Sequence, residues 1–310
     1  MSANVETMFY VGERNKPWHG LGQCVKEAPT SEDALKLAGL DWEVLQTPIY
    51  TSHGRIDGFK ANVRNKDGSV LGVVSDRYKI IQNTEAFSFT DELLGKGVTY
   101  ETAGSLQGGK KVWLLARLPR EYIIAGERIT PYLVFSNTHD GSGAVRVAIT
   151  PIRVVCNNTL NLALDTAPRS FSIIHTGEIM NKIQEAKQTL FMADKYMENL
   201  GREFEKLRKQ EMTTEQVDEY IKLLLPIDED ASPLTKKNIL KLRKDMSDRY
   251  YKAPDLKDLG HNAYRFINAV SDFATHAAPI RKTKNYQENL FMRTYEGNPM
   301  IDKAYQLVCA

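Results

Sequence analysis

The sequence is poor in cysteine, with only Cys24, Cys156 and Cys309 in 310 residues. The three are odd in number, far apart and outside any CxxC spacing, which argues against a disulfide framework and against a zinc site. We expect buried free thiols, the usual state of an unpaired cysteine. The chain also lacks a run of about 18 apolar residues, and it opens without the basic-then-apolar order of a signal peptide. These absences predict a cytoplasmic protein that does not span a membrane.

Neither sign of charge is in excess. The chain has 41 Lys and Arg against 39 Asp and Glu, a net charge of +2, and both halves are nearly neutral. A nucleic-acid-binding domain usually has a clear excess of basic residues. Binding to phosphate would therefore need a local stripe of cations rather than a field from the whole protein.

The common catalytic motifs are missing as well. The chain has no HExxH, no GxSxG elbow and no Cys–His arrangement of recognisable spacing. Gly104 to Gly109 is rich in glycine, but it lacks the full GxxxxGK(S/T) order of a phosphate-binding loop and does not lead from a strand into a helix. The sequence therefore predicts a protein without a cofactor and gives no positive sign of an enzyme.

The N-terminal half has the period-two patterns and turns of β-hairpins. Two apolar runs flank the turn Asn65 to Gly68, and two more flank the glycine-rich turn Gln107 to Lys111. A short helix is expected from Ser31 to Ala38, since acids follow its cap and Gly39 can end it. Another helix is expected from Asn83 to about Leu94.

Further strands are expected at 122–124, 132–135 and 145–155. Val145, Val147 and Ile149 share one face of the last strand, and Arg146 lies on the other. Pro151 cannot donate to a strand ladder, so we expect a bulge or an edge position there.

The C-terminal half is helical in pattern. Apolar residues repeat at heptad spacing from Ile179 to Leu207, which predicts a long helix packed within the chain or, as a second interpretation, against another copy. Capping residues predict helices from Thr213 to Leu225 and from Ser232 to about Arg249. The remaining helices are expected at 261–278, 286–293 and 300–308. We therefore predict an α+β fold, with a β-rich part at 1–169 and a helical part at 170–310 packed on it.

The polar turn from Asn137 to Gly143 contains His139 and Asp140, residue types that serve in acid–base catalysis and metal binding. Adjacent residues on a turn usually point apart, and no further metal-ligating cluster accompanies them. Turn formation is the simpler interpretation, because Asp and Gly favour turns through their backbone.

A second candidate site consists of cations near aromatic side chains. Phosphates would be bound by Lys110, Lys111, Arg146 and Arg153. Trp113 or Tyr78 would provide a surface on which bases stack. The alternative is a solvated turn, together with arginines that pair with carboxylates in the sheet.

Three motifs resemble one known family. They are the arm Trp18-His19-Gly20-Leu21-Gly22, the turn His139-Asp140-Gly141-Ser142, and the run from Thr150 to Leu160. In combination they are similar to the "phage/plasmid-like protein" family, a domain of unknown function of bacteriophages and mobile elements. The segment from Asn262 to Val270, with His276 and Arg281, is similar to the usual ending of that family. The family implies no particular activity.

The order of hairpins, short helix, further strands and then helices also resembles the RecT/Redβ-type single-strand annealing proteins, which form rings or filaments. That resemblance implies a homo-oligomer that binds single-stranded DNA in recombination or replication. The alternatives are an interaction protein of the mobile element that binds a host protein, and a metal-dependent nucleic-acid enzyme acting at His139 and Asp140.

Overall fold

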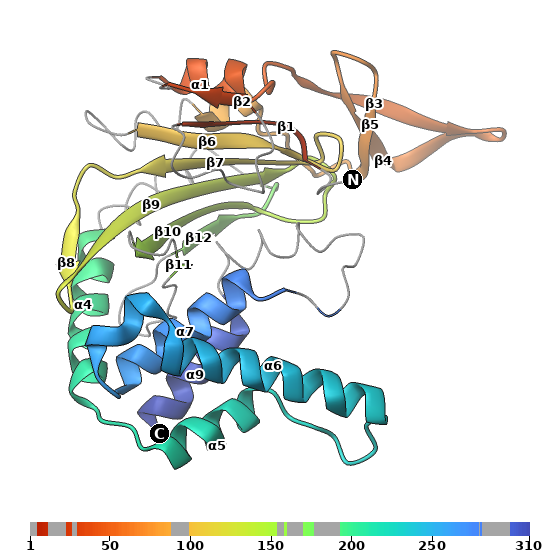
Figure 1. The fold of residues 1–310 in the computed structure, drawn as a ribbon. Coiled ribbons are helices and arrows are strands. Elements are labelled where there is room, and N and C mark those ends of the chain that lie inside the picture. Colours follow the sequence, from red (N-terminus) through yellow and green to blue (C-terminus); the bar gives the residue numbers. More distant parts are fainter. Residues whose placement is uncertain are drawn as a thin grey trace.

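The structure is a computed structural model. It describes residues 5–11, 23–26, 30–87, 99–153, 158–159, 170–176, 193–278, 280 and 298–310. The expected α+β architecture is confirmed, with strands in the N-terminal half and helices in the C-terminal half (Figure 1). The expected boundary near residue 169 lies outside the described residues, and the two-part division stays a prediction.

A large sheet forms the centre of the molecule. Its strand order is β11-β10-β9-β7-β6-β1-β2, with β12 also paired to β10 and β8 to β9. All described neighbours are antiparallel except β1 and β2, which are parallel. Its strands are β1 (Val5–Val11), β2 (Gln23–Val25), β6 (Thr99–Leu106), β7 (Lys111–Arg117), β8 (Tyr122–Ile124), β9 (Glu127–Thr138), β10 (Val145–Arg153), β11 (Asn158–Thr159) and β12 (Ser170–Ile173).

A second sheet has three antiparallel strands: β3 (Val44–Thr51), β4 (Gly54–Arg64) and β5 (Val70–Ser75). The hairpin of β3 and β4 projects away from the body of the molecule (Figure 1). Both expected hairpin turns are confirmed. Gly68 has φ 71° in the first, and Gly108 and Gly109 have φ 68° and 86° in the second, a conformation that favours glycine.

The helices of the C-terminal half lie beneath one face of the large sheet (Figure 1). Helix α1 lies apart from them, near β1 and β6. The bounds are α1 (Ser31–Leu37), α4 (Ala193–Lys209), α5 (Thr214–Leu224), α6 (Pro233–Lys252), the 3-10 helix η2 (Pro254–Leu259), α7 (Ala263–His276) and α9 (Pro299–Cys309). No helix in these described stretches is long and apolar enough to cross a membrane.

Local capping explains where these helices begin. Thr30 caps α1 by accepting from the Asp33 amide, and Thr213 and Gln216 form the expected capping box of α5. Ser232 caps α6 directly before Pro233. Of the helix expected from Asn83, residues 83–87 are helical and the rest lies outside the described residues, as does the helix expected at 286–293.

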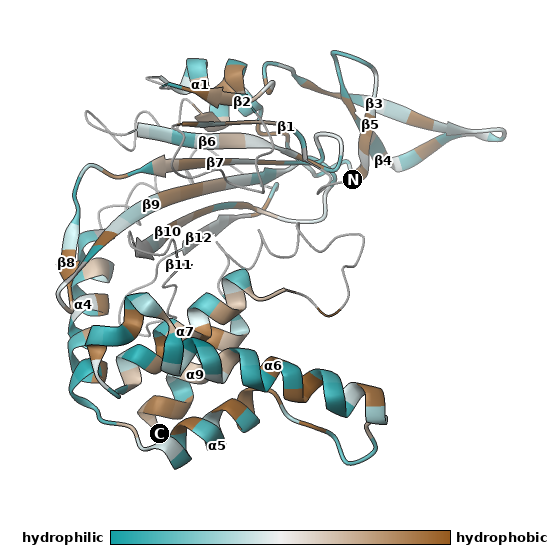
Figure 2. Cartoon of the chain, viewed as in Figure 1, coloured by the Kyte–Doolittle hydropathy of each residue, from teal (hydrophilic) through white to brown (hydrophobic). Residues whose placement is uncertain are grey.

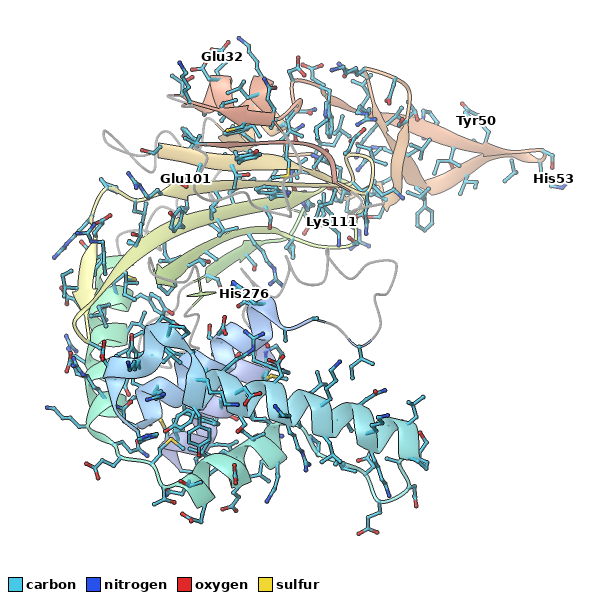
Figure 3. All side chains as sticks on the ribbon, in the orientation of Figure 1. Glu32, Tyr50, His53, Glu101, Lys111 and His276 are labelled. Carbon is cyan, nitrogen blue, oxygen red and sulfur yellow. The ribbon has the colours of Figure 1, made fainter. Side chains whose placement is uncertain are left out.

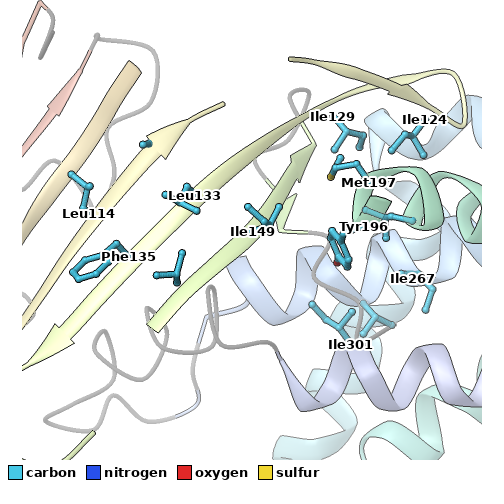
Figure 4. Packing of buried hydrophobic residues seen from close by; sticks show 14 of the residues in the cluster. Leu114, Ile124, Ile129, Leu133, Phe135, Ile149, Tyr196, Met197, Ile267 and Ile301 are labelled. Atoms are coloured by element: carbon cyan, nitrogen blue, oxygen red, sulfur yellow. The ribbon is translucent and has the colours of Figure 1, made fainter. Parts of the chain in front are cut away.

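One hydrophobic core joins the sheet to the helices. Leu114, Leu133, Phe135 and Ile149 share a face of β7, β9 and β10. That face packs toward buried side chains of α4, α7 and α9, including Tyr196, Met197, Ile267 and Ile301 (Figure 4). The core therefore draws on both halves of the chain.

The heptad pattern has an intrachain role in α4. The described part of the pattern begins at Ala193, and its residues Met197, Leu200, Phe204 and Leu207 are buried. The Phe204 ring lies 5.0 Å from the Tyr264 ring of α7. Packing within the chain, the first interpretation, is confirmed for this part.

One expectation needs correction, and of the two expected forms of the Pro151 position one is excluded. Cys24 and Cys309 are exposed rather than buried, because they lie in a short outer strand and at the last turn of α9. Pro151 causes no bulge, since the register of β9 and β10 continues through the pair Pro151 and Pro131. On the other side of β10, the described pairs end at Ala148 and resume at Ile152. Among the described residues, Pro151 therefore lies at a local edge, which is the other expected form.

Candidate nucleic-acid interface at the end of the large sheet

The candidate site forms where β9 ends and the hairpin of β4 and β5 packs against it. Gly72 of β5 lies so close to the turn that a Cβ atom there would be 2.5 Å from the Asp140 Cα. Asn62 of β4 donates its side-chain amide to the His139 carbonyl oxygen at 2.7 Å. The small sheet therefore fixes the backbone of the turn that follows β9.

His139 lies wholly inside this junction. Its Nε2 is 3.0 Å from Asn83 Oδ1, and the Asn83 amide nitrogen donates to the Leu40 carbonyl. The Asn83 side-chain oxygen can only accept a hydrogen bond, so the His139 Nε2 atom must donate and carries the ring proton. The Trp42 ring packs edge-on at 5.4 Å. Burial, with a smaller effect of His175, lowers the pKa of His139 to about 3.

His175 is a second buried histidine at the same junction. Its Nδ1 lies 3.0 Å from the Lys79 carbonyl oxygen, so Nδ1 carries the proton. The ring stacks on Tyr78 with 4.4 Å between centroids. Burial also lowers the pKa of His175. Both imidazoles are therefore neutral near pH 7 and act as packing groups.

The structure does not combine His139 and Asp140 into a reactive pair. His139 points inward toward Asn83, whereas the Asp140 carboxylate accepts from the Ser142 amide at 2.9 Å and shapes the exposed turn. Within the described stretches, no three His, Cys, Asp or Glu side chains are grouped so that they could hold a metal ion. The turn interpretation therefore fits Asp140, and His139 is a core residue rather than a residue of a solvated turn.

The two aromatic candidates are not available for stacking on bases. Trp113 is 2% exposed and Tyr78 is 8% exposed. One face of Tyr78 is covered by His175, and its hydroxyl donates to the Thr138 carbonyl at 2.5 Å. Their expected role as a stacking surface is wrong for this fold, because both rings fill the interior.

Three of the four cations expected to bind phosphate lie at the same end of the large sheet. Lys111 pairs with Thr138 and Arg146 pairs with Ser136, two positions apart on β9, so both side chains project from the same face. Lys110 precedes Lys111 and accepts the His139 amide with its carbonyl. Figure 3 shows Lys111 at this end of the sheet.

Arg153 does not join this group. It pairs with Ile129 at the other end of β10. Arg153 lies seven positions after Arg146, which is roughly 23 Å along a strand. Its side chain lies outside what the structure describes.

The fold adds two cations that sequence reasoning missed. Arg77 and Lys79 are exposed on the segment after β5, and the Lys79 amide donates to the His175 carbonyl at 2.8 Å. They flank Tyr78, and this basic pair around an aromatic residue was the signal in the sequence. Arg77, Lys79 and Lys110 form no ion pair with a described residue. We name Arg77, Lys79, Lys110, Lys111 and Arg146 the sheet-end cations.

Acids also lie near the sheet-end cations. Asp140 and Asp76 are the adjacent acids in the sequence, and Asp76 already lies 3.9 Å from Lys60. Glu6 and Asp67 both pair with Arg64, whose guanidinium lies beside Gly109. Among these described residues, seven cations stand against four acids at this end of the sheet, in a chain whose net charge is only +2. Such a local excess is what phosphate binding by a nearly neutral chain requires.

A second group of basic residues lies on α6. Five basic residues and no acid occur from Pro233 to Lys244, and Lys237 and Lys241 are exposed without an ion pair to a described residue. Asp228, Glu229 and Asp230 directly precede the helix and offset part of this charge. The sheet-end cations are the stronger candidate.

Comparison with known proteins gives one match. No curated protein and no solved structure shows a significant match to the chain. A family model, described as a domain of unknown function (DUF932), matches residues 70–294. The matched region includes all five sheet-end cations, both buried histidines and most of the helical layer. The chain therefore belongs to the DUF932 family.

Proposed function

We propose that the protein binds single-stranded nucleic acid without a cofactor, through the sheet-end cations. The observation that supports this is the position of five basic residues at one end of the large sheet. The strand register brings Lys111 and Arg146 to one face, and the backbone contacts of His139 and His175 bring Lys110 and Lys79 to the same junction.

The chemistry would be phosphate neutralisation rather than base recognition. Lysine and arginine replace counterions along the backbone, which gives affinity that depends steeply on salt and little on sequence. Because Trp113 and Tyr78 are buried, the bases of a bound strand stay free to pair. Such a protein could anneal complementary strands without metal or nucleotide.

The biological setting is part of the same proposal. The resemblance of three motifs to the phage/plasmid-like protein family, and the order of strands followed by helices, support a role in recombination or replication of a mobile element. Annealing proteins act as assemblies, so the proposal includes a homo-oligomer.

Salt dependence is the first test. For the wild-type protein and a fluorescent oligo-dT, we expect the logarithm of the binding constant to fall linearly with the logarithm of salt, with a slope of about −0.7 for each phosphate contact. Lys79→Ala combined with Lys110→Ala should reduce the slope by about 1.4 and weaken binding at low salt. Fluorescence anisotropy over a salt series measures both quantities.

The matched control is Lys237→Ala combined with Lys241→Ala, which removes from α6 two exposed lysines that form no ion pair with a described residue. We expect this variant to keep the wild-type slope. Loss of binding in the α6 variant alone would move the site to that helix and refute the sheet-end assignment. Absence of binding at low salt, or binding without a steep salt slope, would refute the proposed function.

A further inference from the structure

The hairpin of β3 and β4 continues past the third strand of its sheet. Strand β5 pairs with β4 only as far as Phe59, whereas β3 and β4 pair with each other out to Thr51 and Gly54. Among the described residues, 49–57 therefore form a two-stranded ribbon, which projects from the body (Figure 1). Residues 50–55 at its end are all exposed. A two-stranded hairpin gains little stability by itself, so these side chains add little to the fold and are available to a partner.

The end of the ribbon is ordered by its own turn. The Thr51 hydroxyl donates to the Gly54 carbonyl oxygen at 3.2 Å and accepts the His53 amide at 3.2 Å. Gly54 has φ 126°, a conformation that favours glycine. The side chains next to the turn are therefore presented in a defined geometry.

Tyr50 is the large exposed side chain at this end. It is 67% exposed, and its side chain makes no hydrogen bond or ring contact with a described residue. The register pairs it with Arg55, and directly opposite side chains of an antiparallel pair lie on the same side, with Cβ atoms about 5 Å apart. Figure 3 shows the Tyr50 side chain standing off the ribbon, with His53 at the tip. An open aromatic ring beside a guanidinium is a surface on which a nucleobase can stack.

The charges of the ribbon are balanced. Arg55 Nε lies 3.7 Å from Asp57 Oδ1, and both side chains are more than half exposed, so this ion pair is weak. His53 is the one other basic residue from 49 to 58. Figure 2 shows both hydrophobic and hydrophilic segments along the hairpin, so its end is not a continuous apolar patch. The ribbon therefore offers an aromatic ring rather than a stripe of charge, and phosphate contacts must come from elsewhere.

The base of the ribbon adjoins the sheet-end cations. The Gly58 carbonyl oxygen accepts the Asp76 amide at 3.0 Å, and Arg77 follows directly in the sequence. Lys60 lies 3.9 Å from Asp76 and offsets that acid. The register places Tyr50 level with the residue three positions before Gly58, which is roughly 10 Å along the ribbon. A strand that is held at Arg77 and continues along the ribbon would reach the Tyr50 ring within a few nucleotides.

We propose that the Tyr50 ring stacks on a base of a single strand whose phosphates are held by the sheet-end cations. This inference rests on the proposed function and adds a base contact to it. Stacking uses the flat face of a base and every base has one, so the contact tolerates any sequence and leaves the pairing edge free for annealing. Tyr50 thereby takes the role that Trp113 and Tyr78, both buried, do not fill.

The test compares Tyr50→Ala and Tyr50→Phe with the wild type on fluorescent oligo-dT and on an abasic oligonucleotide of the same length. Tyr50→Ala should bind oligo-dT roughly 5- to 150-fold more weakly, the usual loss for one stacked base, and Tyr50→Phe should bind as the wild type does. The salt slope should not change, because no phosphate contact is lost. The abasic oligonucleotide keeps the phosphates without the bases, so all three proteins should bind it alike.

The matched control is Ile123→Ala on β8, an exposed apolar position (72%) outside this sheet, which should bind oligo-dT as the wild type does. With 5-iodouracil in place of a thymine, ultraviolet light should crosslink the strand to Tyr50 of the wild type, as mass spectrometry of the peptides would show. Undiminished oligo-dT binding by Tyr50→Ala at the wild-type salt slope would overturn this inference and leave the proposed function standing. An equal loss on the abasic oligonucleotide would also overturn it, because Tyr50 would then act on the backbone. Absence of oligo-dT binding by the wild type would overturn both.

Discussion

Gly72→Ala is expected to lower the free energy of unfolding by about 3 kcal/mol, the upper part of the range for overpacking. The added Cβ would lie 2.5 Å from the Asp140 Cα and 2.7 Å from its carbonyl oxygen. These are backbone atoms, so a rotamer change cannot relieve the contact. Either β5 or the turn after β9 must move. Chemical denaturation with a fluorescence or circular dichroism signal measures the change.

Gly201→Ala is the matched control, since the same methyl group is added elsewhere. Gly201 lies in α4, and its added Cβ would be 3.6 Å from Ile124 Cγ1, an ordinary contact. Alanine is favoured over glycine in a helix by about 1 kcal/mol, so this variant should be more stable than the wild type. Equal stability of Gly72→Ala and wild type would show that the hairpin of β4 and β5 does not pack on the turn as described.

The second large effect is a loss of stability in mild acid. Burial lowers the pKa of His139 to about 3 in the folded protein, against 6.5 for an ordinary histidine. Between these values the unfolded chain binds a proton that the folded chain does not, so stability falls as pH falls from 6.5 toward 3. From pH 7 to pH 5 this residue alone should remove about 2 kcal/mol. The lowered pKa of His175 acts in the same direction.

The measurement compares the free energy of unfolding at pH 5 and pH 7 for the wild type and His139→Gln. Glutamine retains an amide donor toward Asn83 Oδ1 but does not titrate, so the variant should be less stable at pH 7 and have a flatter pH dependence. Both proteins contain the same carboxylates, such as Glu101, whose pKa is raised by burial. The contribution of these carboxylates to the pH dependence of stability therefore cancels in the comparison. His53→Gln, which makes the same substitution at the exposed tip of the β3 and β4 hairpin, is the matched control (Figure 3). An unchanged slope in His139→Gln would contradict the buried neutral state.

The sequence by itself determined the local elements, because their signals act over a few residues. A glycine at positive φ places a hairpin turn, and a side chain such as Thr30, Thr213 or Ser232 caps a helix two or three residues away. The same reasoning identified Lys110, Lys111, Arg146 and Arg153 as candidate phosphate-binding cations. It left open whether their side chains meet.

Tertiary structure decided the character of the site. Period-two alternation separates the two faces of a strand but does not say whether both are covered, and on β7 Trp113 and Leu114 are buried on opposite faces. For that reason the stacking role of Trp113 and Tyr78 was wrong, and His139 proved to be a core residue.

The pairing of distant strands also decided which cations share a surface. Register brings Arg146 beside Lys111 through β9, and packing of segment 78–83 brings in Lys79, whereas Arg153 stays at the far end of β10. No local signal encodes these contacts, because they depend on which backbone groups find partners across the whole chain. The sequence therefore determined which cations were candidates, and only the tertiary fold decided which of them form one site.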